Sequence, residues 1–306
     1  MPVGKTPCGI AIPQTGSTVN AGLIRSFLER GEELGYESVW VQEQIISDSP
    51  ILEPVTLLAY AAALTSKVRL GSAVLLTVIR NPVQLAKSLA SLDQLSQGRL
   101  TVGVGIGGPH VPERVFGVSS ERRARQFVEG LQVMKALWTQ PRASFSGDFW
   151  RLENVPMEPK PLQKPHPPLW FGARESVALK RAVRHGDGWM GAGSSSSADF
   201  IKQVGEIRRL LDEAKRDLAT FAISKRVYLA IDDDRARAER RLSEWFGVRY
   251  KNAEMAARVS VWGSVGECVD KLNQLVRAGA KHLLLNPVFD EMEQMEVLAA
   301  DIVPRL

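Results

Sequence analysis

The 306-residue chain carries 39 basic and 34 acidic residues, which gives a formal net charge of +5 and a sequence pI near 9.3. Its hydrophobic fraction of 44% and charged fraction of 24% are typical of a globular protein with a full core and exclude a disordered chain. The sequence shows neither an apolar run long enough to span a membrane nor a recognisable leader peptide. We therefore expect a cytoplasmic protein without a membrane partner.

The distribution of charge and cysteine excludes two further classes of protein. Basic and acidic residues are interleaved, as at 121–123 and 235–241, so we do not expect binding to nucleic acid. The two cysteines, Cys8 and Cys268, lie far apart and belong to no Cys/His cluster, so we expect no metal site. Two lone thiols in a chain of this size are typical of reduced core residues.

Strand-like and helix-like segments alternate along the chain. Short apolar runs predict strands at 8–13, 37–43, 68–75, 99–105, 168–171, 188–190, 225–231 and 281–286. Helical patterns follow at 21–34, 54–65, 82–96, 121–138, 176–184, 198–214, 236–246 and 265–278, with a last one at 291–300. Eight strand–helix units predict a single α/β domain over 1–306, a (β/α)8 TIM barrel, with an open doubly wound sheet as the alternative.

One segment, 141–168, interrupts this alternation between the fourth and fifth units. Gly147 and Asp148 lie between aromatic residues and predict a hairpin turn, and the prolines that follow favour an extended path. We interpret the segment as an insertion. Because the aromatic side chains Phe145, Phe149 and Trp150 exceed what a turn requires, we expect the insertion to form a lid or rim that shapes substrate access.

Function in such barrels lies at the carboxyl ends of the strands. The second predicted strand ends in Gln42, Glu43 and Gln44. Strand alternation places Gln42 and Gln44 toward the barrel axis, because Val41 faces the helices. Glu43 can titrate, whereas glutamine only exchanges hydrogen bonds. We take Gln44 and Glu43 as candidate catalytic residues and Gln44 also as a candidate cofactor-binding residue; for Glu43, capping or pairing with a helix outside the barrel is the structural alternative.

Small residues end the third and fourth predicted strands. At the end of the third strand they let backbone approach a flat ring and can mark a bulge, with close helix packing as the alternative. The glycine-rich end of the fourth strand is a weak signal, because it lacks the context of a dinucleotide fingerprint. From these two strand ends we select, as candidate cofactor-binding residues, Ser72, Ala73, Val74, Gly105, Ile106 and Gly107.

Two neighbouring units open their helices with small-residue turns. Such turns offer backbone N–H groups and partial positive charge to a phosphate, to which Arg174 would add a fixed charge. Ordinary N-capping by Ser176 and by the serines at 194–197 is the alternative. The candidate phosphate-binding residues are Gly172, Ala173, Arg174, Gly191, Ala192, Gly193 and Ser194.

An ordered series of motifs resembles the bacterial luciferase-like monooxygenase superfamily, which includes flavin- and deazaflavin-dependent oxidoreductases. The series is ELGYESVWV (33–41), VRLGS (68–72), RNPVQLA (80–86), LDQLSQGRLTVGVG (92–105), PPLWFG (167–172), GDGW (186–189) and LVRAGA (275–280). Each motif alone is weak, but their order over nearly the whole chain is specific. The resemblance implies a TIM barrel with either flavin mononucleotide (FMN) or coenzyme F420 at its mouth.

The resemblance also implies where the cofactor binds. In the family the ring leans on a bulge of the third strand that often contains a non-proline cis peptide, which matches the region of Ala73–Val74 here. The family holds the cofactor phosphate at loops matching 172–174 and 191–194. The chain departs from the family at Gln44, where many members carry a histidine that acts as acid or base. This departure argues against proton removal from an alcohol and favours hydride transfer to an activated double bond or oxygen activation.

The resulting hypothesis is a luciferase-like monooxygenase or an F420-dependent reductase acting on a small organic substrate. The alternative is a non-enzymatic flavin-binding relative that has lost its catalytic histidine. A phosphate-binding isomerase or aldolase should need a lysine or carboxylate pair at the strand ends, and the sequence shows none. The hypothesis adds, as partners, a separate flavin or deazaflavin reductase and a second copy in a homodimer.

Overall fold

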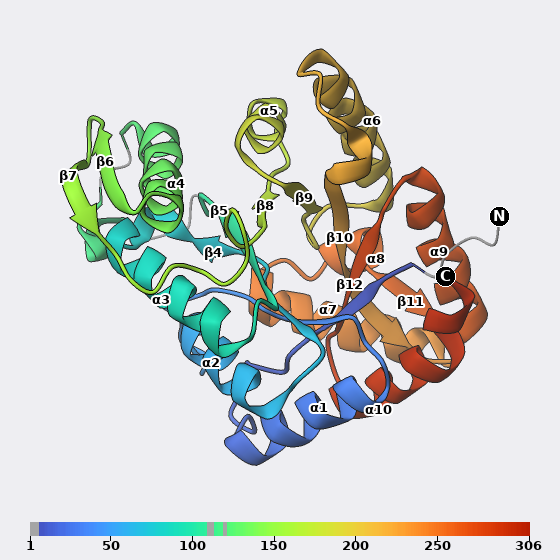
Figure 1. The fold of residues 1–306 in the computed structure, drawn as a ribbon. Coiled ribbons are helices and arrows are strands. Elements are labelled where there is room, and N and C mark those ends of the chain that lie inside the picture. Colours follow the sequence, from blue (N-terminus) through green and yellow to red (C-terminus); the bar gives the residue numbers. More distant parts are fainter. Residues whose placement is uncertain (1–5, 109–112, 119–120) are drawn as a thin grey trace. The chain divides into compact units, whose positions relative to one another are not determined.

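The computed structural model describes residues 6–108, 113–118 and 121–306. The chain divides into two compact units, which we call the terminal unit (Met1–Pro13, Thr18–Trp40 and Gly172–Leu306) and the central unit (Gln14–Ser17 and Val41–Phe171). All eight predicted strands are present, and each is followed by a helix, which is the alternation of a (β/α)8 barrel (Figure 1).

Parallel strands form the core of the terminal unit. They are β1 (Cys8–Ala11), β2 (Ser38–Val41), β9 (Gly188–Gly191), β10 (Ala222–Ile231), β11 (Val261–Gly263) and β12 (His282–Pro287). β1 pairs with β2 and β12, and β12 pairs with β10. β10 also pairs with β9 near its start and with β11 at its end. Because β12 occupies one edge of β10, β9 and β11 follow each other along the opposite edge.

Helices accompany these strands in the terminal unit: α1 (Ala21–Glu33), α5 (Ser176–His185), α6 (Ser197–Glu213), α7 (Arg235–Tyr250), α8 (Met255–Val259), α9 (Val265–Ala278) and α10 (Glu291–Val297). Short 3-10 or π turns lie at Leu218–Thr220, Leu298–Ile302 and Val303–Arg305. Capping boxes at Ser196 and Ser264 begin α6 and α9. Gly279, with φ of 121°, ends α9 as the sequence predicted.

The terminal unit contains an addition that the sequence did not predict. The helix expected at 236–246 is present as α7, but α8 and β11 follow it before α9 leads into β12. A buried cluster holds α7, α8 and β11 together around Tyr228, with Phe246 and Trp262 among its members. The addition was missed because α8 and β11 are too short to show a hydrophobic period.

The central unit has its own parallel strands, β3 (Arg69–Ser72), β4 (Leu75–Leu76), β5 (Leu100–Gly105) and β8 (Leu169–Gly172, whose last residue belongs to the terminal unit). β5 pairs with β3, β4 and β8. The helices are α2 (Pro54–Leu64), α3 (Pro82–Leu95) and α4 (Arg123–Thr139), with 3-10 turns at Thr77–Ile79 and Glu113–Phe116. Prolines stand at the first positions of α2 and α3, where their missing N–H groups cost nothing.

Arg99, the last residue of the LDQLSQGR motif, has a structural role. Its guanidinium donates to the carbonyls of Ala62, Thr65, Val68 and Ser96 at 2.8–3.1 Å and to the Thr65 hydroxyl at 2.8 Å. These bonds tie the end of α2 to the start of β5.

The predicted insertion is a hairpin followed by an extended segment. β6 (Arg142–Ser146) and β7 (Arg151–Pro156) pair antiparallel and lie beside α4 (Figure 1). The bonds Glu158–Pro159 and Lys164–Pro165 of the extended segment are cis. Its Gln163 bonds to both carboxylate oxygens of the fully buried Asp93 at 2.9 and 2.7 Å.

The hairpin turn is anchored to α4 by Glu129, a residue that is only 5% exposed to solvent. Its carboxylate accepts the backbone N–H groups of Asp148, Phe149 and Trp150 at 3.0, 2.7 and 2.9 Å. Arg125 also pairs with the Asp148 carboxylate, at 2.8 Å. The turn therefore has a defined structural partner in α4, whereas its role in substrate access stays a prediction.

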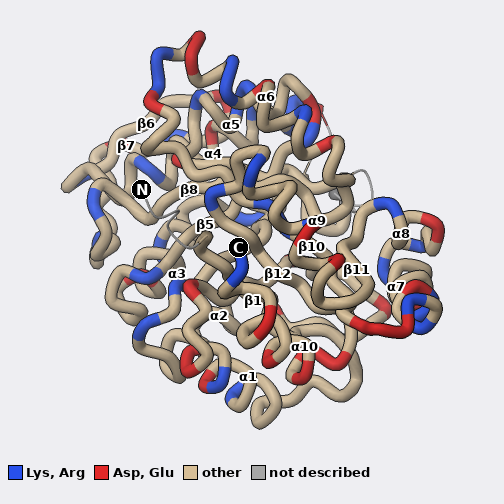
Figure 2. Tube along the Cα trace, turned by 90° about the vertical axis from the view of Figure 1, so that its right-hand side faces the viewer, with Lys and Arg blue, Asp and Glu red and all other residues tan. Residues whose placement is uncertain are grey.

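Charges on the helices are mixed, as the sequence indicated. Figure 2 shows acidic and basic segments next to each other along α1 and α7. Both cysteines are buried thiols outside any disulfide bond, as expected. Within the described ranges 6–108, 113–118 and 121–306, no helix combines the length and apolarity that crossing a membrane requires.

We predict that Glu129→Gln lowers the free energy of unfolding by about 1–3 kcal/mol, because the amide group would face a backbone N–H donor that the carboxylate now accepts. Urea denaturation measures the loss. Glu153→Gln is the matched control, since Glu153 is an exposed hairpin residue whose side chain is 72% exposed. Equal stabilities of the two variants would contradict the anchoring role of Glu129.

Candidate functional site

A bulge in the central unit lies where the sequence predicted it, between β3 and β4. Gly71 faces Thr101 of β5, and Leu75 faces Val104, so four residue steps on one side oppose three on the other. The extra residue falls within 72–74. The Ala73–Val74 peptide bond in this bulge is a non-proline cis bond, as the family resemblance implied.

Two glycines of β5 make room for the bulge. A Cβ on Gly103 would lie 1.8 Å from the carbonyl oxygen of Ser72, and one on Gly105 would lie 2.6 Å from Cγ2 of Val74. The Ser72 hydroxyl donates to the carbonyl of Gly103 and accepts from its N–H, both at 2.9 Å. The glycine-rich strand end is therefore required by the neighbouring backbone, whatever ligand binds there.

The other candidates on this strand end lie just beyond it. Ile106 is partly buried, and its carbonyl accepts a hydrogen bond from Arg123 at 2.5 Å. Gly107 is exposed and has a φ of 81°, a backbone conformation that favours glycine. The structure thus keeps both residues at the end of β5, as expected.

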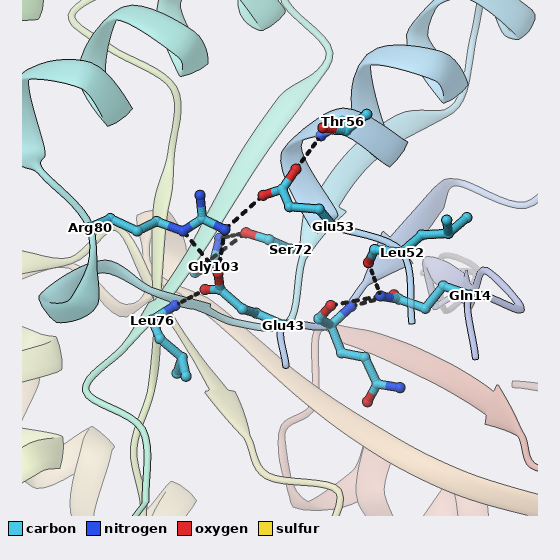
Figure 3. A network of polar contacts seen from close by, with 10 residues as sticks. Gln14, Glu43, Leu52, Glu53, Thr56, Ser72, Leu76, Arg80 and Gly103 are labelled. Atoms are coloured by element: carbon cyan, nitrogen blue, oxygen red, sulfur yellow. Dashed lines mark hydrogen bonds and ion pairs between the residues drawn. The ribbon is translucent and has the colours of Figure 1, made fainter. Parts of the chain in front are cut away.

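Glu43 is the centre of a polar network in the central unit (Figure 3). Its side chain has no exposure to solvent. One carboxylate oxygen accepts the backbone N–H of Leu76, and the other accepts from Arg80, with 2.8 Å to Nε. Leu76 and Arg80 are the residues that cap the 3-10 turn Thr77–Ile79, so Glu43 pairs with both ends of a short helical turn, which agrees with the structural alternative.

Arg80 connects Glu43 to Glu53, which is the residue that does cap a helix. Arg80 donates to Glu53 at 2.7 Å, and Glu53 accepts the N–H of Thr56 in the first turn of α2 at 2.7 Å. Burial disfavours the charged form of Glu53, but the Thr56 and Arg80 hydrogen bonds outweigh it and hold the pKa of Glu53 below its ordinary value. Burial likewise opposes the charge of Arg80, whose pKa is nevertheless raised by Glu43 and Glu53.

Gln44 takes no part in this network. Its side chain is exposed and donates to the carbonyl of Ile46 at 3.4 Å. The backbone of Gln42 is held instead by Gln14, whose amide accepts from the Gln42 N–H at 2.7 Å and donates to its carbonyl at 2.8 Å. Gln44 therefore lies in solvent-accessible chain just after β2, and its catalytic role stays a prediction.

A pocket of about 900 Å³ adjoins the network in the central unit. Arg80, Glu53 and Lys87 contribute its charged groups, and the apolar lining includes Ile45, Ile79 and Phe116. The combination of an apolar wall with a fixed ion pair is typical of a site for a small organic molecule.

The terminal unit contains a second, polar pocket of about 420 Å³. It is formed by the loops after β8 and β9 and by α6 and α8, and it is lined by Arg174, Glu175, Ser176, Ser194, Ser195, Asp199, Lys202, Gln203, Glu206 and Arg258. The structure thus brings together Arg174 and Ser194, whose side chains lie 3.4 Å apart (Nη1 to Oγ). Both belong to the set that the sequence selected for a phosphate.

The two helices beside this pocket differ at their N-termini. α6 is closed by its own capping box, in which Ser196 and Asp199 bond to each other's backbone. α5 has no side-chain cap within the described part of the chain. Capping thus accounts for the serines before α6, as the alternative reading held, while α5 keeps N–H groups and partial positive charge for an anion.

Gln203 lines the pocket with an unsatisfied atom. The residue is 9% exposed, and its Nε2 donates to the Arg174 carbonyl at 3.1 Å. Its Oε1 is buried and has no hydrogen-bond partner among the residues described. A buried acceptor of this kind fits a ligand that offers a donor, as the hydroxyl groups next to the phosphate of a ribityl chain do.

Gly191, the last residue of β9, and Gly193 of the loop after it are required by packing. A Cβ on Gly191 would lie 2.7 Å from the ring of Phe200, and one on Gly193 would lie 2.6 Å from the ring of Tyr228. Lys225 of β10 lies beneath the same loop, with 2% of the residue exposed. Sequence reasoning missed Lys225 because it stood at the edge of a predicted apolar strand; a lone charge there was the available signal.

Comparison with known proteins places the chain in a family. The profile of the luciferase-like monooxygenases matches residues 9–282. The chain belongs to the luciferase-like monooxygenase family. Within the described residues, no group of three or more His, Cys, Asp or Glu side chains is placed to hold a metal ion.

Individual relatives differ in the redox cofactor that they use. An uncharacterised protein of Mycobacterium tuberculosis is 43% identical over 141 residues, 45% of this chain and 49% of that protein, so the alignment spans about half its length. The F420-dependent glucose-6-phosphate dehydrogenase of Kineococcus radiotolerans is 26% identical over 93% of both chains. The FMNH2-dependent dimethylsulfone monooxygenase of Pseudomonas putida is 34% identical over 51% of this chain and 43% of that protein.

A solved structure confirms the predicted fold. An F420-dependent secondary alcohol dehydrogenase superimposes with a TM-score of 0.86 at 21% identity and covers 98% of this chain and 99% of its own. A likeness at this identity shows the fold alone, which is the TIM barrel that the sequence predicted.

We predict that Arg80→Met lowers the free energy of unfolding by about 3–5 kcal/mol, because it leaves the buried Glu43 carboxylate without its cation. Arg25→Met is the control, since Arg25 and Glu29 form an exposed pair with side chains 52% and 48% exposed. Urea denaturation compares the two variants. A loss at Arg80 as small as that at Arg25 would show that the network around Glu43 does not hold the central unit.

Proposed function

We propose that the protein is an oxidoreductase that uses FMN or coenzyme F420 on a small organic substrate. The observation that carries the proposal is the polar pocket beside Arg174 and Ser194, with the uncapped N-terminus of α5 at its edge. Its donor set suits a phosphate, which both cofactors contain, and the unsatisfied Oε1 of Gln203 suits a hydroxyl group beside that phosphate.

The proposal assigns the cofactor ring to the bulge. Ser72, Ala73 and Val74 would contact the ring, together with the end of β5 at Gly105, Ile106 and Gly107. When bound, the flavin or deazaflavin ring supplies hydride transfer, and reduced flavin also activates dioxygen. The protein's part is to hold the ring at a fixed backbone surface, because the Ser72–Gly103 hydrogen bonds fix the bulge against β5.

The residues after β2 limit the types of reaction that the site can catalyse. Glu43 is committed to Arg80 and the Leu76 N–H, so its carboxylate is not available to carry a proton to a substrate. Gln44 cannot titrate. Both facts favour hydride transfer to an activated double bond or oxygen activation over the removal of a proton from an alcohol. A separate reductase and a homodimer complete the proposal as partners.

The direct test is a fluorescence titration of the apo-protein with FMN and with F420, each oxidised and reduced. The proposal predicts saturable binding of one of these cofactors. It also predicts that the reduced cofactor is consumed when a substrate that can be reduced or oxygenated is added. Arg174→Met should weaken binding at least about tenfold, or about 1.4 kcal/mol, through loss of a charge on the phosphate. Arg209→Met, at an exposed residue of α6, should bind normally.

Two results would contradict the proposal. Absence of binding to both cofactors in a folded protein would overturn it entirely. Binding without any turnover of the reduced cofactor would instead support the non-enzymatic relative, which the missing histidine at position 44 favours.

We predict that Gln44 contributes no ionisation to catalysis, so Gln44→Ala should lower turnover by the equivalent of about 0.5–1.5 kcal/mol, the worth of one neutral hydrogen bond. Gln44→His should add a limb near pH 6.5 to the pH–rate profile, where imidazole titrates. A wild-type profile that already shows such a limb, and loses it in Gln44→Ala, would overturn this assignment.

A further inference from the structure

Lys225 is a buried cation whose hydrogen bonds all go to one loop. The ammonium group donates to the carbonyl of Ala192, to the carbonyl of Ser195 at 2.9 Å and to the Ser195 hydroxyl at 3.1 Å. Three acceptors match the three protons of an ammonium group. Ala192 and Ser195 belong to the loop after β9, whose next residues begin α6.

These bonds determine which way the loop presents its backbone. In a trans peptide the C=O and the following N–H point in opposite directions. The carbonyls of Ala192 and Ser195 point to Lys225, so the N–H groups of Gly193 and Ser196 point away from it. The Ser196 N–H confirms this geometry, because it donates at 2.9 Å to Asp199, which lines the pocket. That bond belongs to the capping box of α6, so the Gly193 N–H is the group that this orientation directs toward a ligand.

The inner side of the loop is also filled. Phe200 and the Cδ atom of Lys225 would both contact a Cβ on Gly191, at 2.7 and 3.3 Å, and Tyr228 lies under Gly193. The loop therefore rests on Lys225 and two aromatic rings. Its other side contributes Ser194 and Ser195 to the polar pocket.

We propose that Lys225 is the positioning residue that turns the Gly193 N–H of this loop toward the cofactor phosphate. The inference rests on the proposed function, since it takes the phosphate to be that of FMN or F420. Lys225 does not touch the ligand in this proposal. It acts through the peptide groups that it holds and through its charge.

The surroundings of Lys225 make its proton labile. Burial lowers the pKa of Lys225, Asp199 of α6 opposes this, and Arg226 on the same strand reinforces it, with a net pKa of about 7. Arg174, Lys202 and Arg258, with the acids Glu175 and Glu206, also line the pocket. Above about pH 7 Lys225 loses one donor and its positive charge, so phosphate binding should weaken as pH rises.

This pH dependence has the opposite sign to that of the phosphate itself. The second ionisation of a phosphate ester, with a pKa of about 6, makes the ligand more anionic as pH rises and would strengthen its binding. A fall in affinity above neutral pH would therefore be caused by a titrating group of the protein and not by the ligand.

The experiment compares each chromophore with and without its phosphate: FMN against riboflavin, or F420 against the phosphate-free 8-hydroxy-5-deazaflavin. Dissociation constants are measured by fluorescence for the wild type and Lys225→Met from about pH 6 to about pH 8.5, which brackets the pKa of about 7. Methionine keeps the length of the side chain and removes the charge and the donors. Amide hydrogen exchange of residues 191–196 is measured on the same proteins without ligand.

We expect Lys225→Met to weaken binding of the phosphorylated form at least about tenfold at pH 6, or about 1.4 kcal/mol, and to leave the phosphate-free form within about twofold. The wild-type affinity for the phosphorylated form should fall above pH 7, and that fall should be absent from the variant. Exchange at 191–196 should be faster in the variant. Arg174→Met should weaken binding without removing the pH dependence.

Lys281→Met is the matched control. Lys281 also donates to three backbone carbonyls, those of Leu218, Ala219 and Phe221, in a turn that does not line the pocket. It should lose stability but keep the wild-type affinity and its pH dependence.

The outcomes separate the two proposals. A wild type that binds neither chromophore overturns the proposed function and the cofactor part of this inference together. If the wild type binds, two results would overturn the role of Lys225 alone. The affinity of Lys225→Met could equal that of the wild type, or the variant could bind the phosphorylated and the phosphate-free forms equally weakly. Unchanged exchange at 191–196 would also overturn it, because the loop would then not depend on the ammonium group.

Discussion

A carboxylate without exposure to water must be matched by donors, and the architecture of the central unit depends on how Glu43 is matched. Leu76 supplies a backbone N–H from β4, the strand just after the bulge. Arg80 supplies a guanidinium from the short segment that precedes α3. Arg80 then reaches the cap of α2 through Glu53. One buried charge therefore fixes the end of β2, the far side of the bulge and the start of a helix at once.

The terminal unit uses the opposite charge in a comparable way. Carbonyl and hydroxyl oxygens of the loop after β9 accept the hydrogen bonds of Lys225, whereas Glu43 accepts hydrogen bonds from its donors. Because burying an ion is unfavourable unless its hydrogen bonds are satisfied, each charge forces the surrounding backbone into one orientation. The strand ends of this fold thereby acquire shapes that apolar packing alone would not specify.

Much of the fold could be predicted because it depends on local patterns. Apolar runs predicted all eight strands, Gly147 and Asp148 predicted the hairpin turn, and small residues at 72–73 predicted the bulge. The family resemblance added the position of the cis bond. Each of these features is determined by residues that are neighbours in the chain, so a single sequence contains its signal.

The parts that were missed depend on partners distant in sequence. Strand parity gave no information on Glu43, whose direction is set by Arg80, 37 residues away. Glu129 and the hairpin turn meet across a helix, and Lys225 is 30 residues from the loop that it holds. The short strand β11 pairs with the part of β10 that extends beyond β9. Such pairings require the fold before they can be recognised.

The central claim, that the loops after β8 and β9 receive the phosphate of a flavin or deazaflavin, is tested most directly by a crystal structure of the protein with FMN or F420 bound. The account predicts phosphate oxygens within hydrogen-bond distance of Arg174, Ser194 and the N-terminus of α5, with a ligand hydroxyl on the Oε1 atom of Gln203. A bound cofactor whose phosphate lies elsewhere, with none of these groups in contact, would contradict it.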